Sequence, residues 1–515
     1  MPKISRGHWL VFLACLLGFG LFLLISAVVG GQSGFPLDDA WIHQTYARSL
    51  ARYGRFAYVP GVTSAGSTAP LWTILLSVGY VLHIPYLFWT YLLGFVSLLW
   101  LATAVMQVWR VVWPDLAGKD WLAGLVTALS WPLLWAAASG METLLFAALG
   151  LQIVALYARI AVQGTARLRW LALLGVLSGL LILIRPDGLV LLMLIALGLF
   201  LLPGTVGERA KVLLVYGGTA VLAMIPYFLF NYLTSGAIWP NTFYAKQTEY
   251  AAVLQQFIGT RILQLFYFSL GGSDVGWQGI NAAHFLLLPG VIYGGWLALR
   301  RDWRQKQLAA TLPLLWAGGH VMLYAWRLPV TFQHGRYLMA AIPIWLIYGL
   351  GGWIKLLFGR QSSGRALWLA QRVAGVTFVL MLLFFLFQGA VAYATDVAIV
   401  EGEMVTVAQW LVENTPEDAL IASHDIGAIG YFAERPLLDL AGLISPEIIP
   451  LLADEAALEQ YVLQSEADYL VTAPGWPYTA VADASGAILV FTTNFTLTQD
   501  AGLNNMTVYQ LKTVR

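Results

Sequence analysis

The apolar run WLVFLACLLGFGLFLLISAVVG, residues 9–30, decides the fold class of this chain. It contains no charged residue, and it is longer than the roughly 20 residues that a helix needs to cross the hydrocarbon core of a bilayer. The whole chain of 515 residues has the same character, with 59% hydrophobic and only 11% charged residues. Because a soluble protein is about one quarter charged, we predict an integral membrane protein.

Further apolar runs bounded by charge, Pro or Gly bring the number of candidate spans to about eleven. They are residues 9–30, 86–109, 121–138, 142–158, 170–184, 188–202, 212–230, 282–299, 308–326, 337–357 and 373–392. If the N-terminus is cytoplasmic, alternate short loops collect 17 of the 28 Lys and Arg but only four of the 27 Asp and Glu. Cytoplasmic loops are enriched in Lys and Arg, so this alternation predicts a multi-pass protein of the cell membrane.

The same alternation leaves two long loops on the extracytoplasmic side, residues 31–85 and 231–281. The apolar stretch 71–82 is too short to span and is expected to lie at the outer surface as a helix. We therefore divide the chain into a transmembrane domain, residues 1–395, and an extracytoplasmic domain, residues 396–515. The second domain is acidic, and its apolar runs shorten to strand length. Strands are predicted at 419–423, 468–473, 488–493 and 506–511, and helices near 401–414 and 454–464. A small α/β domain is predicted.

The first outer loop contains FPLDDAWIHQTYARSLARYG, residues 35–54, with two adjacent acids at the start of a helical pattern and Gly54 as its stop signal. Asp39 and His43 lie four residues apart and share a face of that helix. One carboxylate can be explained as a helix cap. The second carboxylate is not explained in this way, because adjacent carboxylates repel each other and only one can cap. At least one of Asp38 and Asp39 is therefore predicted to be functional. An oxygen and nitrogen site for a divalent cation at Asp38, Asp39 and His43 stays open as an alternative.

Two short motifs put charged residues at the outer ends of predicted spans. SGMETLLF carries Glu142 where a span begins, and LIRPDGLV carries Arg185 and Asp187 in an outer turn. A carboxylate in a span should lie at its edge or face a wet cavity, because burying it in lipid is costly. The alternatives are stabilisation of a helix N-terminus by Glu142 and a structural Arg/Asp pair that closes the turn.

Two further motifs bring cations to the outer face. IWPNTFYAKQ contains Asn241, Tyr244 and Lys246, and TFQHGRYL contains His334 and Arg336 directly before a span. Lys supplies a point charge and Arg donates two parallel hydrogen bonds, so these residues suit a lipid-borne phosphate. They would equally serve as interfacial anchors that reach for lipid headgroups.

The order of these motifs carries a family resemblance. DDAWIHQTYARSLA, SAGSTAPLW, SGMET, RPDG, PNTFYAK and HGRY follow one another as in the GT-C class of polyprenyl-phosphate-sugar-dependent glycosyltransferases. The chain resembles its arabinofuranosyltransferase-like and mannosyltransferase-like members over residues 1–392. The resemblance implies a GT-C-like helical membrane domain that transfers a sugar from a polyprenyl-phosphate carrier to a hydroxyl of a glycan, lipid or protein acceptor outside the cytoplasm.

The resemblance also implies roles for the residues singled out above. It makes Asp39 or Asp38 the general base, because an acceptor alcohol is a poor nucleophile until its proton is removed. We expect the cations to hold the departing phosphate and the remaining polar residues to bind substrate, and direct displacement would invert the anomeric centre. The expected phosphate ligands are Lys246, Arg336, His334 and Arg185, and the expected substrate ligands are Glu142, His43, Asn241, Tyr244 and Asp187.

Other functions are weaker readings of the same sequence. A transporter or a flippase of lipid-linked sugars should carry ionisable residues at mid-membrane, whereas here they gather at the outer ends of spans. A binding module on an inactive membrane anchor would leave the acids and cations without a shared purpose. The net charge of +1 gives no basis for binding nucleic acid, and there is no Walker loop, HExxH or CxxC motif to indicate a cofactor.

Overall fold

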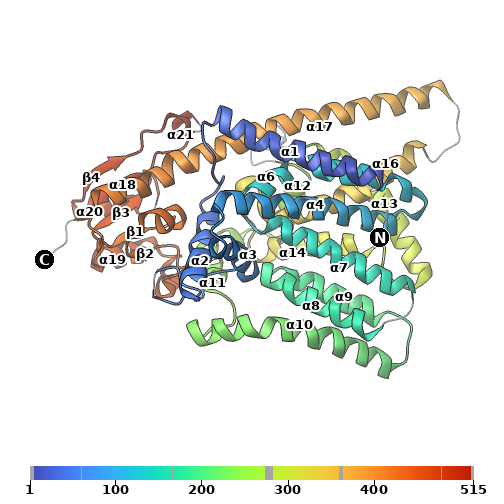
Figure 1. Ribbon diagram of the computed structural model, residues 1–515, viewed down its shortest axis with the longest axis horizontal. Helices are drawn as coiled ribbons and strands as arrows, with labels where there is room; N and C mark the ends of the chain where they lie inside the picture. The colour runs from blue at the N-terminus through green and yellow to red at the C-terminus, as the bar shows by residue number, and fades with distance from the viewer. Residues whose placement is uncertain are drawn as a thin grey trace.

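A helical body and a smaller sheet domain at one end make up the chain (Figure 1). The computed structural model describes residues 5–59, 61–163, 167–272, 282–358, 364–476, 478–500 and 502–511. The main helices of the body run side by side. They are α1 (Arg6–Val29), α4 (Tyr86–Val112), α5 (Asp120–Leu129), α6 (Trp131–Ala138), α7 (Thr143–Gln163), α8 (Leu168–Ile184), α9 (Gly188–Phe200), α10 (Val206–Ser235), α13 (Leu288–Gln305), α14 (Leu312–Arg327), α16 (Ile342–Phe358) and α17 (Arg365–Val400).

Each of the eleven stretches predicted to span is largely helical. Within the described residues, six helices are long and apolar enough to cross a membrane, and a seventh span results if the pair α5 and α6, bent by 58°, is counted as one. Helices α8 and α9 are apolar but shorter, with 17 and 13 residues. The chain is thus a mostly helical protein with several membrane-spanning helices, and the number eleven stays a prediction.

Close helix packing in the body depends on small residues. At Gly94 of α4 a Cβ atom would collide with the carbonyl oxygen of Ala137 in α6. The backbones of these two helices therefore touch, which only a glycine permits. Helix α6 is buried along its whole length and carries Trp131 and Trp135 into the interior.

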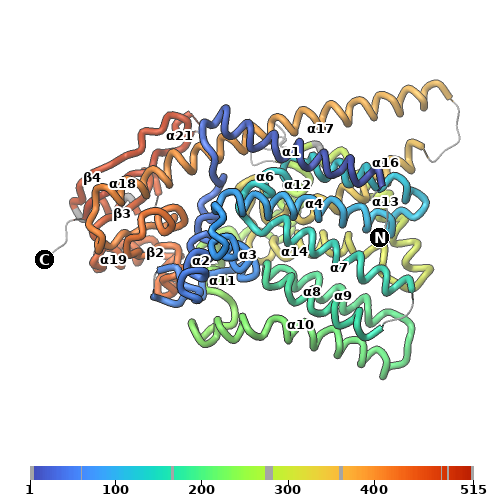
Figure 2. The backbone as a smooth tube through the Cα atoms, in the orientation of Figure 1, coloured from blue at the N-terminus to red at the C-terminus, as the bar shows by residue number. Residues whose placement is uncertain are grey.

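Several shorter helices accompany the body. They are α2 (Asp39–Tyr53), α3 (Pro70–Val81), α11 (Asn241–Glu249), α12 (Ile258–Ser269) and the single turn α15 (Phe332–Gly335). Of these, α2, α3 and α11 lie between the body and the sheet domain (Figure 2). The helix expected from residues 35–54 is confirmed as α2, and it ends at Gly54, whose positive φ of 65° is the left-handed conformation that suits a glycine after a helix. The helix expected at 71–82 is confirmed as α3, although its position at the membrane surface stays a prediction.

The sheet domain has five strands in the order β2-β1-β3-β5-β4. Strand β1 (Ile421–Ser423) pairs in parallel with β2 (Leu437–Asp439) and β3 (Tyr469–Thr472), whereas β5 (Thr507–Gln510) pairs antiparallel with β3 and β4 (Ile488–Thr492). Four strands were predicted, and β2 was missed because only two apolar residues, Leu437 and Leu438, precede Asp439 in it. Helices α18 (Thr406–Asn414), α19 (Glu455–Gln464), α20 (Thr479–Ser485) and α21 (Thr496–Asp500) complete an α/β arrangement.

The junction between the two parts is helical. Helix α17 runs through the predicted boundary at 395/396 and continues through a π-helical turn, Glu401–Val405, into α18. The boundary therefore falls inside a continuous helical segment, and the domain limits stay a prediction.

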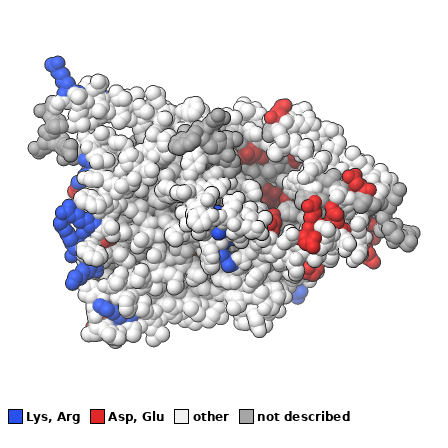
Figure 3. All heavy atoms as spheres, turned by 180° about the vertical axis from the view of Figure 1, so that it is seen from behind, with Lys and Arg blue, Asp and Glu red and all other residues white. Residues whose placement is uncertain are grey.

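Charge separates the two ends of the molecule. On the face shown in Figure 3, Lys and Arg gather at the end of the helical body that lies away from the sheet domain, and Asp and Glu gather over the sheet domain. This is the distribution that the loop pattern of the sequence predicts.

Candidate functional site

A cavity of about 660 Å³ opens where α2, α11, the turn between α8 and α9, and the end of α14 meet. One part of its wall is apolar and comes from α9 and α14, including Leu189, Val190, Met193, Leu323 and Trp326. The other part is polar and contains seven of the residues singled out in the sequence. They are Asp39, His43, Glu142, Arg185, Asp187, Lys246 and Arg336. Outer ends of separate helices therefore contribute to one pocket.

Asp39 forms an ion pair with Arg336 in the cavity wall. The guanidinium Nη2 of Arg336 lies 2.8 Å from Oδ2 of Asp39. Withdrawal from bulk water would by itself raise the pKa of Asp39, but the positive charges of Arg336 and Lys246 hold this pKa well below its usual range. Asp39 is therefore a charged carboxylate at neutral pH.

Two cations meet at the hydroxyl of Tyr337, a cavity residue that the sequence reading did not single out although it lies in the HGRYL motif. Lys246 Nζ donates to this oxygen at 2.8 Å, and Arg336 Nη2 donates to it at 3.0 Å. Burial would lower the pKa of Lys246, but Tyr337 and the charge of Asp39 raise it, so the ammonium stays protonated. Arg336 Nε and Nη1 are buried and have no hydrogen-bond partner in the described part of the chain.

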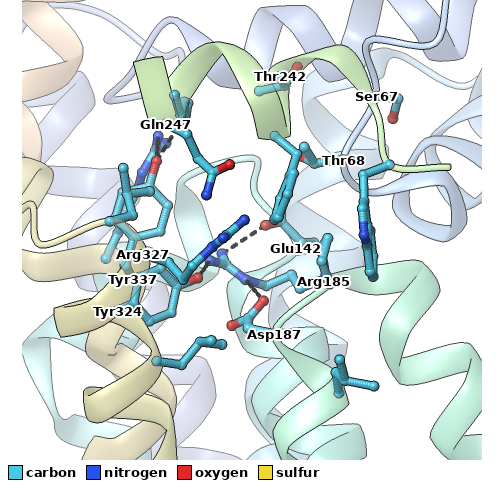
Figure 4. Close-up of a pocket in the computed structure, with 18 of the residues that line it drawn as sticks. Ser67, Thr68, Glu142, Arg185, Asp187, Thr242, Gln247, Tyr324, Arg327 and Tyr337 are labelled. Atoms are coloured by element: carbon cyan, nitrogen blue, oxygen red, sulfur yellow. Dashed lines mark hydrogen bonds and ion pairs between the residues drawn. The ribbon is translucent and has the colours of Figure 1, made fainter. Parts of the chain in front are cut away.

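Arg185 is the centre of a second ionic group (Figure 4). Its guanidinium donates to Glu142 Oε1 at 2.9 Å, to Asp187 Oδ1 at 3.2 Å and to the hydroxyl of Tyr324 at 2.6 Å. All three of its partners are buried. Arg185 and Asp187 thus do close the turn between α8 and α9, and Glu142 joins the pair from the start of α7.

Histidines extend this group on both sides. His43 Nε2 lies 3.4 Å from Glu142 Oε2, and His320 Nδ1 lies 3.5 Å from Asp187 Oδ2. The other ring nitrogen of His320 is 2.8 Å from the backbone oxygen of Tyr337, so this residue connects the two ionic groups. The sequence reading missed His320 because it lies in the middle of an apolar run, without a motif around it.

Asp38 faces away from the cavity. Its two carboxylate oxygens accept hydrogen bonds from the backbone N–H groups of Gly427 and Ala428 at 2.6 and 2.7 Å, at the start of a helical turn of the sheet domain. Burial, together with the nearby charge of Asp425, raises the pKa of Asp38 to about 7, although the two N–H groups favour its charged form. Asp38 therefore caps a helical turn that lies 389 residues further along the chain.

Three other residues chosen from the sequence do not line the cavity. Asn241 ties α11 to the sheet domain, because its side-chain amide donates to the carbonyl of Leu443 at 3.3 Å. Tyr244 packs edge to face against Phe243 with ring centroids 5.5 Å apart. His334 Nε2 lies 2.8 Å from Asp396 Oδ2.

The candidate cation ligands do not converge. Asp38 binds backbone N–H groups, Asp39 pairs with Arg336, and His43 faces Glu142. Among the residues that the structure describes, no group of three or more His, Cys, Asp or Glu side chains is close enough to share a metal ion.

Two polar residues complete the cavity wall near its apolar part. Arg327 packs its guanidinium over the ring of Phe243 at 4.7 Å, and Gln247 follows Lys246 on α11. Neither residue was singled out in the sequence. An arginine at the end of a span, such as Arg327, reads as an interfacial anchor.

Solved structures of two proteins share this fold. ArnT from Cupriavidus metallidurans in the apo state has a TM-score of 0.60 at 14% identity, over 98% of this chain and 98% of that chain. The structure of the same protein bound to undecaprenyl phosphate has a TM-score of 0.57 at 15% identity, over 99% of both chains. The Archaeoglobus fulgidus oligosaccharyltransferase in the apo form has a TM-score of 0.60 at 14% identity, over 92% of this chain and 70% of that chain.

Both proteins are GT-C glycosyltransferases, so the resemblance seen in the sequence motifs is confirmed at the level of the fold. A family profile described as a domain of unknown function (DUF8728) matches residues 389–509, which include the sheet domain. No curated protein sequence matches the chain.

Proposed function

We propose that this protein is a glycosyltransferase that moves a sugar from a polyprenyl-phosphate carrier to an acceptor hydroxyl on the extracytoplasmic side of the membrane. One observation carries the proposal. A single cavity holds a charged carboxylate, Asp39, beside the cations Lys246 and Arg336, and its wall continues into an apolar part. Sugar transfer from a lipid phosphate needs all three features together, because it requires a base, a phosphate site and a place for an isoprenoid chain.

Asp39 is the proposed general base. The acceptor hydroxyl loses its proton to this carboxylate while its oxygen forms a bond to the anomeric carbon, and the bond from that carbon to the phosphate oxygen breaks. Asp38 does not suit the role, because both of its oxygens are engaged by Gly427 and Ala428 outside the cavity.

Lys246 and Arg336 are the proposed ligands of the donor phosphate. Arg336 keeps two buried nitrogens, Nε and Nη1, without partners in the described part of the chain, and an unpaired buried donor is costly unless a ligand satisfies it. A phosphate that binds there competes with Asp39 for Arg336. Its arrival frees the carboxylate from its ion pair and makes it a stronger base at the moment when the donor is bound.

Arg185 has a supporting role in this proposal. It already binds Glu142, Asp187 and Tyr324, and it has little capacity left for a phosphate. It fixes the two carboxylates in the cavity wall, where their second oxygens, which face His43 and His320, are available to sugar hydroxyls. Glu142 Oε2 and Asp187 Oδ2 have no hydrogen-bond partner in the described residues, which fits this use.

The apolar wall is the proposed site for the isoprenoid chain. Leu189, Val190 and Met193 come from α9, and Met193 is largely exposed on the outside of the body. A lipid chain that leaves the cavity there reaches the hydrocarbon core of the membrane without crossing a polar surface. Direct displacement of the phosphate by the acceptor oxygen inverts the anomeric centre.

The proposed orientation follows from charge. The end rich in Lys and Arg is expected in the cytoplasm, and the cavity lies near the opposite end beside the acidic sheet domain. The acceptor, whether a glycan, a lipid or a protein, therefore approaches from outside the cell. A divalent cation in the site remains an open part of the proposal, and its effect is measurable by adding a chelator to the assay.

Purified protein in detergent, supplied with polyprenyl-phosphate sugars and a panel of acceptors, tests the proposal. Transfer by the wild-type protein that is lost in Asp39→Asn supports it. Reversible movement of the lipid-linked sugar between the leaflets of a vesicle, without transfer to any acceptor, supports a flippase instead and refutes the proposal.

A further inference from the structure

The backbone directly before Arg336 adopts a left-handed turn. Gln333, His334 and Gly335 have φ values of 51°, 59° and 69° in succession. Glycine adopts this region freely, but residues with a side chain resist it, because Cβ comes too close to the following carbonyl oxygen. Two such residues in a row persist only where surrounding contacts hold them, and strained backbone of this kind clusters at functional sites.

The backbone N–H of Gly335 donates to the carbonyl of Thr331 at 3.0 Å, and the His334 side chain ties the turn to the neighbouring helices. His334 Nε2 lies 2.8 Å from Asp396 Oδ2, and the same oxygen accepts a hydrogen bond from Trp135 Nε1 at 2.8 Å. The imidazole is also enclosed edge to face by Trp131 and Trp135, with ring centroids 5.1 and 5.5 Å away. The turn is thus fastened to α6 and α17, and His334 itself does not reach the cavity.

The turn determines where Arg336 points. Arg336 follows Gly335 directly, and its guanidinium meets Asp39 at 2.8 Å and the hydroxyl of Tyr337 at 3.0 Å. In a right-handed continuation of the chain, the direction of the Arg336 side chain would differ, because each residue of a helix rotates the next by a fixed angle. The left-handed turn is therefore coupled to the position of the guanidinium in the cavity.

We propose that His334 and Asp396 are positioning residues: their hydrogen bond holds the left-handed turn that directs Arg336 toward the phosphate of the lipid-linked donor. This inference rests on the proposed function, since it concerns the same phosphate site. It replaces the role expected for His334 from the sequence, which was direct contact with the phosphate. It also gives a role to Asp396, which lies on the helix that leads into the sheet domain.

Three variants separate these roles in a transfer assay. Asp396→Asn removes the carboxylate. We expect the KM for the donor to rise about tenfold, because loss of one charged hydrogen bond produces a change of that size. The KM for the acceptor should stay unchanged. His334→Gly removes the imidazole but allows the left-handed backbone, so the protein should fold and show the same change. The double variant should be no worse than either single variant, because both remove one interaction.

Gln333→Gly is the matched control. It relaxes the same turn but leaves the bond between His334 and Asp396 intact, so the donor KM should stay at the wild-type value and the melting temperature should not fall. Titration with polyprenyl phosphate in detergent gives a second readout that is independent of transfer, and the affinities should change in parallel with the donor KM.

The outcomes are distinct. An unchanged donor KM and lipid-phosphate affinity in Asp396→Asn, with both weakened in His334→Gly, would show direct contact of His334 with the phosphate and overturn the inference. Additive effects in the double variant would also overturn it. Wild-type protein that neither transfers sugar nor binds polyprenyl phosphate would instead refute the proposed function.

Discussion

Asp39→Asn is the most informative single substitution in this protein. Asparagine has nearly the same shape but lacks the negative charge and the basicity of the carboxylate that pairs with Arg336 at 2.8 Å. If Asp39 removes the acceptor proton, kcat should fall by about 10²–10⁴, the usual contribution of a general base. That loss corresponds to about 3–5 kcal/mol of transition-state stabilisation.

The same substitution should leave binding of the lipid phosphate intact or strengthen it. Two unit charges 2.8 Å apart attract by about 6 kcal/mol at an effective dielectric constant of about 20, before desolvation is subtracted. In the wild-type protein the phosphate competes with this attraction for Arg336. The variant removes the competitor, so the inhibition constant for polyprenyl phosphate should be equal to or lower than that of the wild type.

Steady-state transfer kinetics measure kcat, and product inhibition by polyprenyl phosphate measures its inhibition constant. Asp38→Asn is the neighbouring control, since this side chain binds Gly427 and Ala428 rather than the cavity. It should lower stability by about 1–3 kcal/mol, as expected for weakened hydrogen bonds to a partly charged group, and leave kcat of the folded protein within a few-fold of wild type. A wild-type kcat in Asp39→Asn at normal folded yield, or equal losses in both variants, would refute the assignment.

Three further predictions concern other parts of the molecule. Lys246→Met should raise the inhibition constant for polyprenyl phosphate about tenfold, because it removes a half-buried charge from the proposed phosphate site, and direct titration of the lipid checks this. His424 lies between two carboxylates that, against the effect of burial, raise its pKa from 6.5 to about 10. The folded protein thus holds this proton more tightly than the unfolded chain does. The stabilisation is therefore complete below about pH 6.5 and is lost as the pH rises toward 10. The difference in melting temperature between wild type and His424→Gln should shrink over that interval. Gly94→Ala should destabilise by about 1–3 kcal/mol or more through a collision with α6, whereas Gly20→Ala, with open space around it, should leave the melting temperature unchanged.

The helices of the body could be predicted from the sequence because lipid imposes a simple rule. Every backbone polar group in the membrane must be satisfied within its own segment, so a long apolar run becomes a helix whatever lies beside it. Strands β1, β3, β4 and β5 were visible for a similar local reason, since each alternates or concentrates apolar residues over several positions. Strand β2 was not visible, because only two apolar residues precede Asp439 in it, and its pairing with β1 is set by the tertiary structure.

The candidate site could be predicted only in part. Charge patterning in the sequence predicted Asp39, Lys246 and Arg336 on one side of the membrane, and the structure brings the three residues to one cavity. It did not distinguish Asp38 from Asp39, because neighbouring residues at the start of a helix point about 100° apart and only the tertiary structure decides which one meets the cavity. His320 gave no local signal, since its partners Asp187 and Tyr337 lie on other segments.

The sequence by itself thus determined a multi-helix membrane chain with an acidic α/β domain, and the groups of residues from which the site is made. The tertiary structure decided the partners: Asp39 with Arg336, Asp38 with the sheet domain, and His334 with Asp396. The physical reason is the distance along the chain over which each interaction acts. Hydrophobic periodicity and helix capping act over a few residues, whereas an ion pair in a cavity depends on the packing of segments that lie hundreds of residues apart.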